Sequence, residues 1–136
     1  MTTAIVTGGA GFIGSHLVDA LLAENISVRV IDNYSTGRPE NLAHVAGQVE
    51  LVEADFAKSG SWQKLFQDTD WVFHLGALAD IVPSIQRPAD YFQANVDGTF
   101  NVLEAAKNAG VKRFVYAASS SCYGIPDKYP TSEDAD

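Results

Sequence analysis

Short apolar segments alternate with stretches of helical spacing along the whole chain. Five apolar segments have the length of buried strands, and we expect strands at residues 3–7, 26–31, 49–53, 70–74 and 113–117. Strands that alternate with helices form parallel sheets with helices on both faces. The pattern therefore predicts an α/β fold, a doubly wound parallel sheet with a helix in each connection and strand order 3-2-1-4-5. Glu50 and Glu53 interrupt the third segment, which favours the sheet edge.

Apolar residues at helical spacing predict two clear helices. Ile13, Leu17 and Leu21 recur every four residues, so we expect a helix that ends near Glu24 and packs this stripe on the sheet. The longest helix is expected over residues 88–109, followed by a glycine of the kind that ends helices. One face of this long helix is marked by Val96, Phe100 and Leu103, with Val102 and Ala106 extending it.

The composition narrows the classes of function. The 136 residues, 46% of them hydrophobic, suffice for one domain over residues 1–136, and no linker or repeat divides them. The formal charge of -8, from 17 acidic against 9 basic residues, creates no attractive field for nucleic acid or for an anionic membrane. We therefore expect no nucleic-acid and no membrane partner.

Cysteine and histidine usage argues against metal binding and against secretion. The single cysteine, Cys122, cannot build a disulfide framework, and His16, His44 and His74 do not have the spacing of metal ligands. No apolar run approaches the about 20 residues of a membrane span, and the first residues lack the basic region of a secretory signal. We expect a soluble, cytoplasmic protein without a metal ion.

A glycine-rich turn links the first strand to the first helix. Gly9, Gly11 and Gly14 fit the spacing G-x-G-x-x-G, in which backbone approaches a pyrophosphate and the helix N-terminus faces it. Asp32 follows 18 residues later at the end of the second strand, where a carboxylate can accept hydrogen bonds from both adenosine ribose hydroxyls. Together they predict a dinucleotide-binding Rossmann fold. An ordinary strand-to-helix connection, with Asp32 as a turn residue, is the alternative.

The Asp32 carboxylate also favours NAD over NADP. A 2′-phosphate next to this carboxylate, with unit charges near 4 Å, is disfavoured by on the order of 1–4 kcal/mol. Arg38 lies six residues further on. We interpret Arg38 as a loop anchor or as a stacking partner for adenine rather than as a phosphate ligand.

With these features the sequence resembles the extended short-chain dehydrogenase/reductase family, in particular its nucleotide-sugar epimerases and dehydratases. Six segments in the same order carry the resemblance and span essentially the whole chain. They are Thr7–Gly14, Asp32–Asn33 with Ser35–Arg38, Ala54–Phe56, His74–Ala77, Asn95–Asn101 and Ser119–Gly124.

The resemblance implies NAD as the cofactor and a set of residues that bind it. For the pyrophosphate these are Gly8, Gly11 and Gly14, with the N–H groups of Phe12 and Ile13; for the adenosine, Asp32, Asn33, Asp55 and Phe56; and beneath the ribose and nicotinamide half, Leu75, Gly76 and Ala77. The other expected cofactor residues are Ser35, Thr36, Gly37 and Asn95. Asp55 as a turn residue, and Asn95 as a residue that pins a helix to a loop, are alternatives.

The resemblance also implies a substrate site after the fifth strand. Ser119 corresponds to the catalytic hydroxyl that bonds to the sugar hydroxyl being oxidised, and Ser120 and Ser121 are expected to contact the substrate. This strand directs its loop to the same end of the sheet as the glycine turn. A polar loop without a catalytic role is the alternative.

The family's Tyr-x-x-x-Lys pair, in which the lysine lowers the tyrosine pKa, is absent from this sequence. The chain closes with a polar stretch at residues 133–136, after the fifth strand. We therefore expect an amino-terminal portion, truncated after the fifth strand, that retains part of the NAD site but does not turn over substrate.

Within the resembled family we favour a UDP-sugar 4-epimerase as the parent enzyme, with a nucleotide-sugar substrate and transient oxidation at C4. A nucleotide-sugar 4,6-dehydratase is one alternative, but Ser120 and Ser121 stand where dehydratases usually carry an acidic pair. A non-catalytic dinucleotide-binding or sensing domain is the other. Because relatives often pair through their long helix, we expect a homodimer to be possible through an exposed apolar face of residues 88–109.

Overall fold

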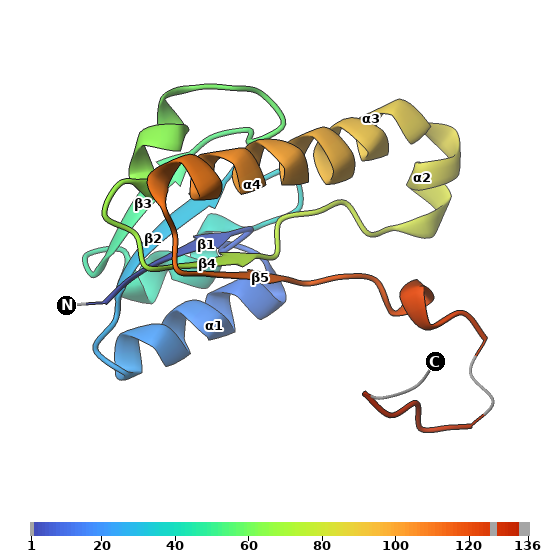
Figure 1. Cartoon of the computed structure of the whole chain (residues 1–136), viewed down its shortest axis with the longest axis horizontal. Helices are drawn as coiled ribbons and strands as arrows, with labels where there is room; N and C mark the ends of the chain where they lie inside the picture. The colour runs from blue at the N-terminus through green and yellow to red at the C-terminus, as the bar shows by residue number, and fades with distance from the viewer. Residues whose placement is uncertain (1, 126–127, 134–136) are drawn as a thin grey trace.

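The computed structural model, which describes residues 2–125 and 128–133, contains a five-stranded parallel sheet (Figure 1). The strand order is β3-β2-β1-β4-β5, which confirms the predicted order and the edge position of the third strand. Residues 134–136 of the closing polar stretch lie outside the described residues. The strands are β1 (Thr3–Thr7), β2 (Ser27–Asp32), β3 (Val49–Glu53), β4 (Trp71–His74) and β5 (Arg113–Tyr116).

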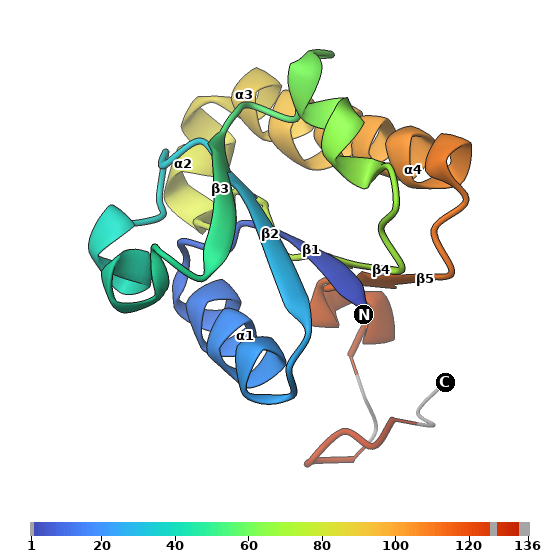
Figure 2. The ribbon, with the colours of Figure 1, turned by 90° about the vertical axis from the view of Figure 1, so that its left-hand side faces the viewer.

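Helical segments cover both faces of the sheet (Figure 2). Side chains alternate along β1, so that Ala4 and Val6 pack with α1 (Phe12–Ala23) on one face and Ile5 packs on the other. The second face is covered by α4 (Gly98–Ala109) and a 3-10 helix, Ser61–Phe66. The continuous apolar runs of the central strands follow from this burial on both faces.

Two connections differ from the prediction of an α-helix in each. A 3-10 helix, Pro39–Val45, joins β2 to β3, and another, Ser61–Phe66, joins β3 to β4. Each segment has only six or seven residues, which is too short to show helical periodicity, yet each buries apolar residues such as Leu42 or Phe66 on the sheet.

The predicted long helix is divided into parts. The chain forms α3 (Pro88–Phe92), a π-helical turn (Gln93–Asp97) and then α4, and an unpredicted short helix, α2 (Ile81–Gln86), precedes them. A π turn adds a residue to the helical repeat and changes which side chains share a face. The predicted C-terminal glycine, Gly110, lies in the left-handed conformation at φ +71.

The two sets of apolar residues assigned to one face of the long helix lie on different faces. Val102, Ala105 and Ala106 are buried against the sheet, whereas Phe100 is 61% exposed, and Phe92, Val96 and Leu103 are exposed with it. The buried face therefore carries small or β-branched side chains, and the exposed face carries the larger ones. None of the helices described is long and apolar enough to cross a membrane.

Candidate functional site

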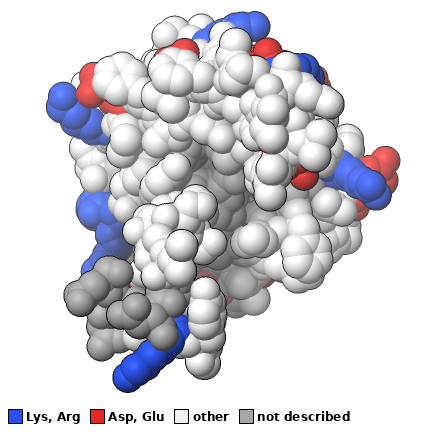
Figure 3. Space-filling view, turned by 90° about the vertical axis from the view of Figure 1, so that its right-hand side faces the viewer, with Lys and Arg blue, Asp and Glu red and all other residues white. Residues whose placement is uncertain are grey.

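A groove of about 340 Å³ lies at the carboxyl ends of the strands. Figure 3 faces this side of the molecule and shows a hollow bordered mainly by uncharged residues. Three residues that the sequence analysis did not name, Leu78, Ala94 and Ala117, line it. The predicted cofactor residues that line it are Gly8, Gly11, Phe12, Ile13, Gly14, Asp32, Asn33, Ser35, Thr36, Gly37, Asp55, Phe56, Leu75, Gly76 and Ala77.

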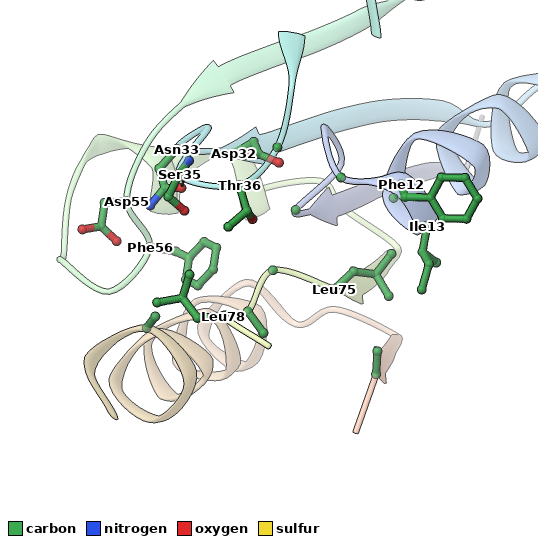
Figure 4. Close-up of a pocket in the computed structure, with 18 residues that line it drawn as sticks. Phe12, Ile13, Asp32, Asn33, Ser35, Thr36, Asp55, Phe56, Leu75 and Leu78 are labelled. Atoms are coloured by element: carbon green, nitrogen blue, oxygen red, sulfur yellow. Dashed lines mark hydrogen bonds between the residues drawn. The ribbon is translucent and has the colours of Figure 1, made fainter. Parts of the chain in front are cut away.

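The groove brings together loops from several strand ends. In Figure 4 the residues that follow β2 and β3 stand at one end, Phe12 and Ile13 of α1 at the other, and Leu75 lies between them. Parallel strands of a doubly wound sheet reverse their order between β1 and β4, and ligands bind in the crevice at this point.

The glycine turn packs so closely on neighbouring backbone that side chains are excluded from it. Gly8 has φ +70, and a Cβ there would lie 2.7 Å from the Cα of Gly76. A Cβ on Gly14 would lie 2.8 Å from the Cα of Gly9. Gly9 itself faces Val30 of β2 and does not line the groove, so it serves packing of the turn on the sheet.

The N-terminus of α1 opens directly on the groove. Gly11 is its N-cap in an extended conformation, with no side-chain cap and no acidic residue in the first turn. The first backbone N–H groups of a helix lack intrahelical acceptors and, with the helix dipole, attract an anion. Phe12 and Ile13, 78% and 68% exposed, stand beside this positive end.

Asp32 is fixed at the end of β2 by the backbone around it. It is 5% exposed, and its Oδ2 accepts a hydrogen bond from Ala10 N at 2.9 Å while Oδ1 accepts one from Tyr34 N at 2.8 Å. A Cβ on Gly37 would lie 2.9 Å from Oδ1, so the loop after β2 closes over the carboxylate. Burial, followed by the charges of Asp32 and Glu53, raises the pKa of Tyr34.

Asp55 and Phe56 shape the end of the groove beyond β3. Asp55 accepts a hydrogen bond from Ala57 N at 3.0 Å, and the Phe56 ring packs so closely on Gly76 and Gly98 that a Cβ on either glycine would collide with it. Asn101 donates hydrogen bonds to the carbonyl oxygens of Phe56 and Ala57, both at 3.1 Å. These contacts tie the β3 loop to α4.

Two other predicted regions do not line the groove. The carboxamide of Asn95 donates to Leu78 O and accepts from Leu78 N, both at 2.8 Å, so it holds the loop after β4 against the π turn. Ser119 caps a 3-10 turn by accepting a hydrogen bond from Ser121 N at 3.2 Å, and the exposed serines 119–121 follow Ala117, which does line the groove.

His74 has a role that the sequence analysis did not assign. It is 1% exposed at the end of β4 and contacts the hydroxyl groups of Thr7 and Thr99. Burial lowers the pKa of His74 from 6.5 to about 4, so the ring is neutral at pH 7. The sequence signal for this role was that His74, a polar residue, ends an apolar strand directly before Leu75-Gly76.

These features fit the shape and charge of NAD. The glycine cradle and the α1 N-terminus suit a pyrophosphate, and the buried Asp32 carboxylate lies at the same edge to accept ribose hydroxyls. Within residues 2–125 and 128–133 no group of three or more His, Cys, Asp or Glu side chains is placed to hold a metal ion.

The model of the NAD dependent epimerase/dehydratase family matches residues 4–136, nearly the whole chain. The chain belongs to this family. The resemblance found in the motifs is thereby confirmed, and NAD is the cofactor of the family.

Curated proteins resemble this chain over nearly its whole length. UDP-glucose 4-epimerase of Pasteurella multocida is 38% identical, covering 95% of this chain and 40% of that protein. UDP-glucuronic acid decarboxylase 1 of Arabidopsis thaliana is 40% identical, covering 95% of this chain and 29% of that protein. The chain therefore spans less than half the length of these relatives.

Solved structures of the family share this fold. The crystal structure of UDP-glucose 4-epimerase from Stenotrophomonas maltophila, with bound NAD and formylated UDP-arabinopyranose, superposes with a TM-score of 0.89 at 30% identity. The enzyme from Bifidobacterium longum, in complex with NAD+ and UDP, gives 0.88 at 30% identity. Each match covers 99% of this chain and 42% of the solved chain.

Proposed function

We propose that this chain is the NAD-binding domain of a UDP-sugar 4-epimerase, with residues 1–136 forming one binding unit. The observation that carries the proposal is a single groove with a glycine cradle at the α1 N-terminus and the fixed Asp32 carboxylate at the end of β2. The likeness to several solved 4-epimerases favours this activity over that of the decarboxylase relatives. Both kinds of relative are named for UDP-sugars, which supports the substrate class.

In this proposal the residues of the chain bind and orient. The free N–H groups of the first turn of α1 hold the pyrophosphate, and the Asp32 carboxylate accepts hydrogen bonds from the ribose. Bound NAD supplies a hydride acceptor and donor for the sugar C4. The Ser119 hydroxyl, on the loop that leaves β5 beside Ala117, is the proposed catalytic contact to the sugar hydroxyl, with Ser120 and Ser121 as further substrate contacts.

The proposal separates cofactor binding from turnover. The sequence holds no Tyr-x-x-x-Lys pair, and loss of a general base typically costs about 10² to 10⁴ in rate. We expect the 136-residue chain to bind NAD without epimerising UDP-glucose. Mass spectrometry of the purified chain for carried NAD, and calorimetry with added NAD, test the first part; a coupled assay for UDP-galactose tests the second.

No carried NAD together with no binding heat would contradict the function proposed here. A measurable epimerase rate from this chain alone would contradict the expectation that turnover needs a tyrosine base that this sequence lacks. A cytoplasmic location belongs to the same proposal and is supported by the single cysteine of the sequence.

A second copy of the chain is the proposed occupant of the exposed apolar face of α3, the π turn and α4. Its large residues lie four, four and three positions apart, a spacing that lines up side chains along one side of a helix and suits pairing with an equivalent helix. They are Phe92, Val96, Phe100 and Leu103.

A further inference from the structure

A chain of hydrogen bonds runs beneath the groove from one of its lining residues to the π turn. Gly76 N donates to Thr7 Oγ1 at 3.3 Å, and Thr7 Oγ1 lies 2.6 Å from His74 Nδ1. On the other side of the ring, His74 Nε2 lies 2.9 Å from Thr99 Oγ1, which donates to Asn95 O at 2.7 Å. The ring therefore joins β1 and β4 to α4.

The hydroxyl protons fix the donor and the acceptor of each hydrogen bond in this series. Each threonine hydroxyl has a single proton, and that of Thr99 is donated to Asn95 O. Thr99 must therefore accept a hydrogen bond from His74 Nε2–H. The bare Nδ1 then accepts from the Thr7 hydroxyl, which in turn accepts from Gly76 N–H. Every donor is matched only when His74 is neutral and carries its proton on Nε2.

The residues at both ends of this series of hydrogen bonds hold the same wall of the groove. The segment Leu75–Leu78 lines the groove throughout. Its first half is held at Gly76 by Thr7, and its second half at Leu78 by the two hydrogen bonds of the Asn95 carboxamide. Asn95 is also the residue whose carbonyl ends the chain of hydrogen bonds from His74.

We propose that His74 is a positioning residue for NAD, which as the neutral Nε2–H tautomer fixes the wall Leu75–Leu78 of the groove proposed to hold the cofactor. The inference rests on the proposed function. The rings of Phe56, Phe114 and Tyr116 surround His74. Packing alone would be served by a phenylalanine, but a phenylalanine would leave both threonine hydroxyls without their partner.

Calorimetric titration of NAD into matched variants of this chain tests the role of His74. Thr7→Val keeps the shape of the residue but removes the bond to Gly76, and His74→Gln can serve only one threonine well. We expect each to weaken NAD binding about tenfold, the effect of one buried hydrogen bond. Thr69→Val is the control, because Thr69 is also buried and hydrogen-bonded. Thr69 precedes β4 and so lies at the amino ends of the strands, whereas the groove lies at their carboxyl ends.

Thr69→Val should change the NAD affinity by less than about twofold. Equal losses in Thr7→Val and Thr69→Val would overturn the inference, because they would reflect general stability. Undiminished binding by His74→Gln would overturn it too. A failure of the unmodified chain to bind NAD would instead contradict the proposed function, so the two failures are distinguishable.

The protonation of the His74 ring can be measured independently in the unmodified protein. A long-range proton–nitrogen NMR spectrum of ¹⁵N-labelled chain reports which histidine nitrogen carries hydrogen, and it does not depend on any variant folding. We expect the Nε2–H form for His74 near neutral pH. A proton on Nδ1, or on both nitrogens, would contradict the direction of the hydrogen bonds and with it the proposed role.

Discussion

The Asp32 carboxylate combines a negative charge with a rigid setting. Both oxygens accept backbone N–H groups, from Ala10 and from Tyr34, which leaves lone pairs on each oxygen for ribose hydroxyls. Because these bonds hold the side chain in place, the carboxylate cannot easily turn away from a 2′-phosphate. We therefore propose that the choice between NAD and NADP depends on Asp32 and on the backbone that holds it.

We predict that the chain binds NAD at least about fivefold more tightly than NADP, since the repulsion is on the order of 1 kcal/mol or more. Asp32→Asn keeps the shape of the side chain and one accepting oxygen but removes the charge, so the preference should shrink. Glu53→Gln, on the neighbouring strand and outside the groove, should leave it unchanged. Titration calorimetry with both cofactors measures the ratio, and equal affinities of the unmodified chain would contradict the prediction.

His74 makes the stability of the fold depend on pH. Burial lowers its folded pKa to about 4, below its ordinary value of 6.5. Between these two values the unfolded chain binds a proton that the folded chain does not. The stabilisation is therefore fully present above pH 6.5 and is lost as the pH falls toward 4, with a total of about 3 kcal/mol.

We predict that the free energy of unfolding falls by about 2 kcal/mol more in the unmodified chain than in His74→Gln when the pH is lowered from about 7.5 to about 5. Urea denaturation of both proteins at each pH measures the difference. Carboxylates titrate in both proteins and cancel in the comparison. An identical pH dependence of the two chains would show that His74 is not held neutral by the fold.

The turn between β1 and α1 is the element on which the groove depends. Its glycines leave no room for side chains, and Gly14 faces the backbone of Gly8 and Gly9 across the turn. The surrounding atoms are backbone, which cannot move aside as a flexible side chain does. The same closeness lets the helix N-terminus approach an anion.

We predict that Gly14→Ala lowers the free energy of unfolding by about 1–3 kcal/mol and weakens NAD binding. Gly47→Ala is the matched control, because nothing lies within 4 Å of a Cβ at that position. It should change stability by less than about 0.5 kcal/mol. Urea denaturation measures both variants, and equal stability of Gly14→Ala and Gly47→Ala would contradict the packing described for the turn.

At this scale the sequence predicts strands better than connections. β1 and β3 begin and end where expected, and β2, β4 and β5 differ by one residue at one or both ends. The central strands are easy to place because buried parallel strands are continuous apolar runs between polar turns. The connections near Leu42 and Phe66 are too short for a periodic signal. The π turn at Gln93–Asp97 has no local signal in the sequence, and its Asn95 pairs with Leu78, a residue 17 positions away.

The groove as a whole follows from motif order and topology. Every predicted cofactor residue except Asn95 lines it, because the motifs follow strand ends that a parallel sheet gathers at one edge. The sequence does not reveal which contact each of these residues makes. Gly9 packs on Val30 while Gly8 faces Gly76. His74 forms hydrogen bonds with two threonines from other elements. Such pairings depend on contacts between distant segments.

Association of whole molecules is expected through the exposed helix face. We predict that Phe100→Glu shifts sedimentation of a concentrated sample toward the monomer, since it places a charge within an apolar contact. Asn108→Glu adds the same charge at an exposed position of the same helix and should leave the association unchanged. A purely monomeric unmodified chain at high concentration would contradict the proposed second copy.

The exposed apolar side chains at the start of α1 affect the heat capacity of cofactor binding. Phe12 and Ile13 stand in water at the groove wall. A cofactor that covers them removes nonpolar area from solvent, which lowers the heat capacity of the system. Complex formation would then become more exothermic on warming, so that the enthalpic share of the affinity grows with temperature even where the affinity itself changes little.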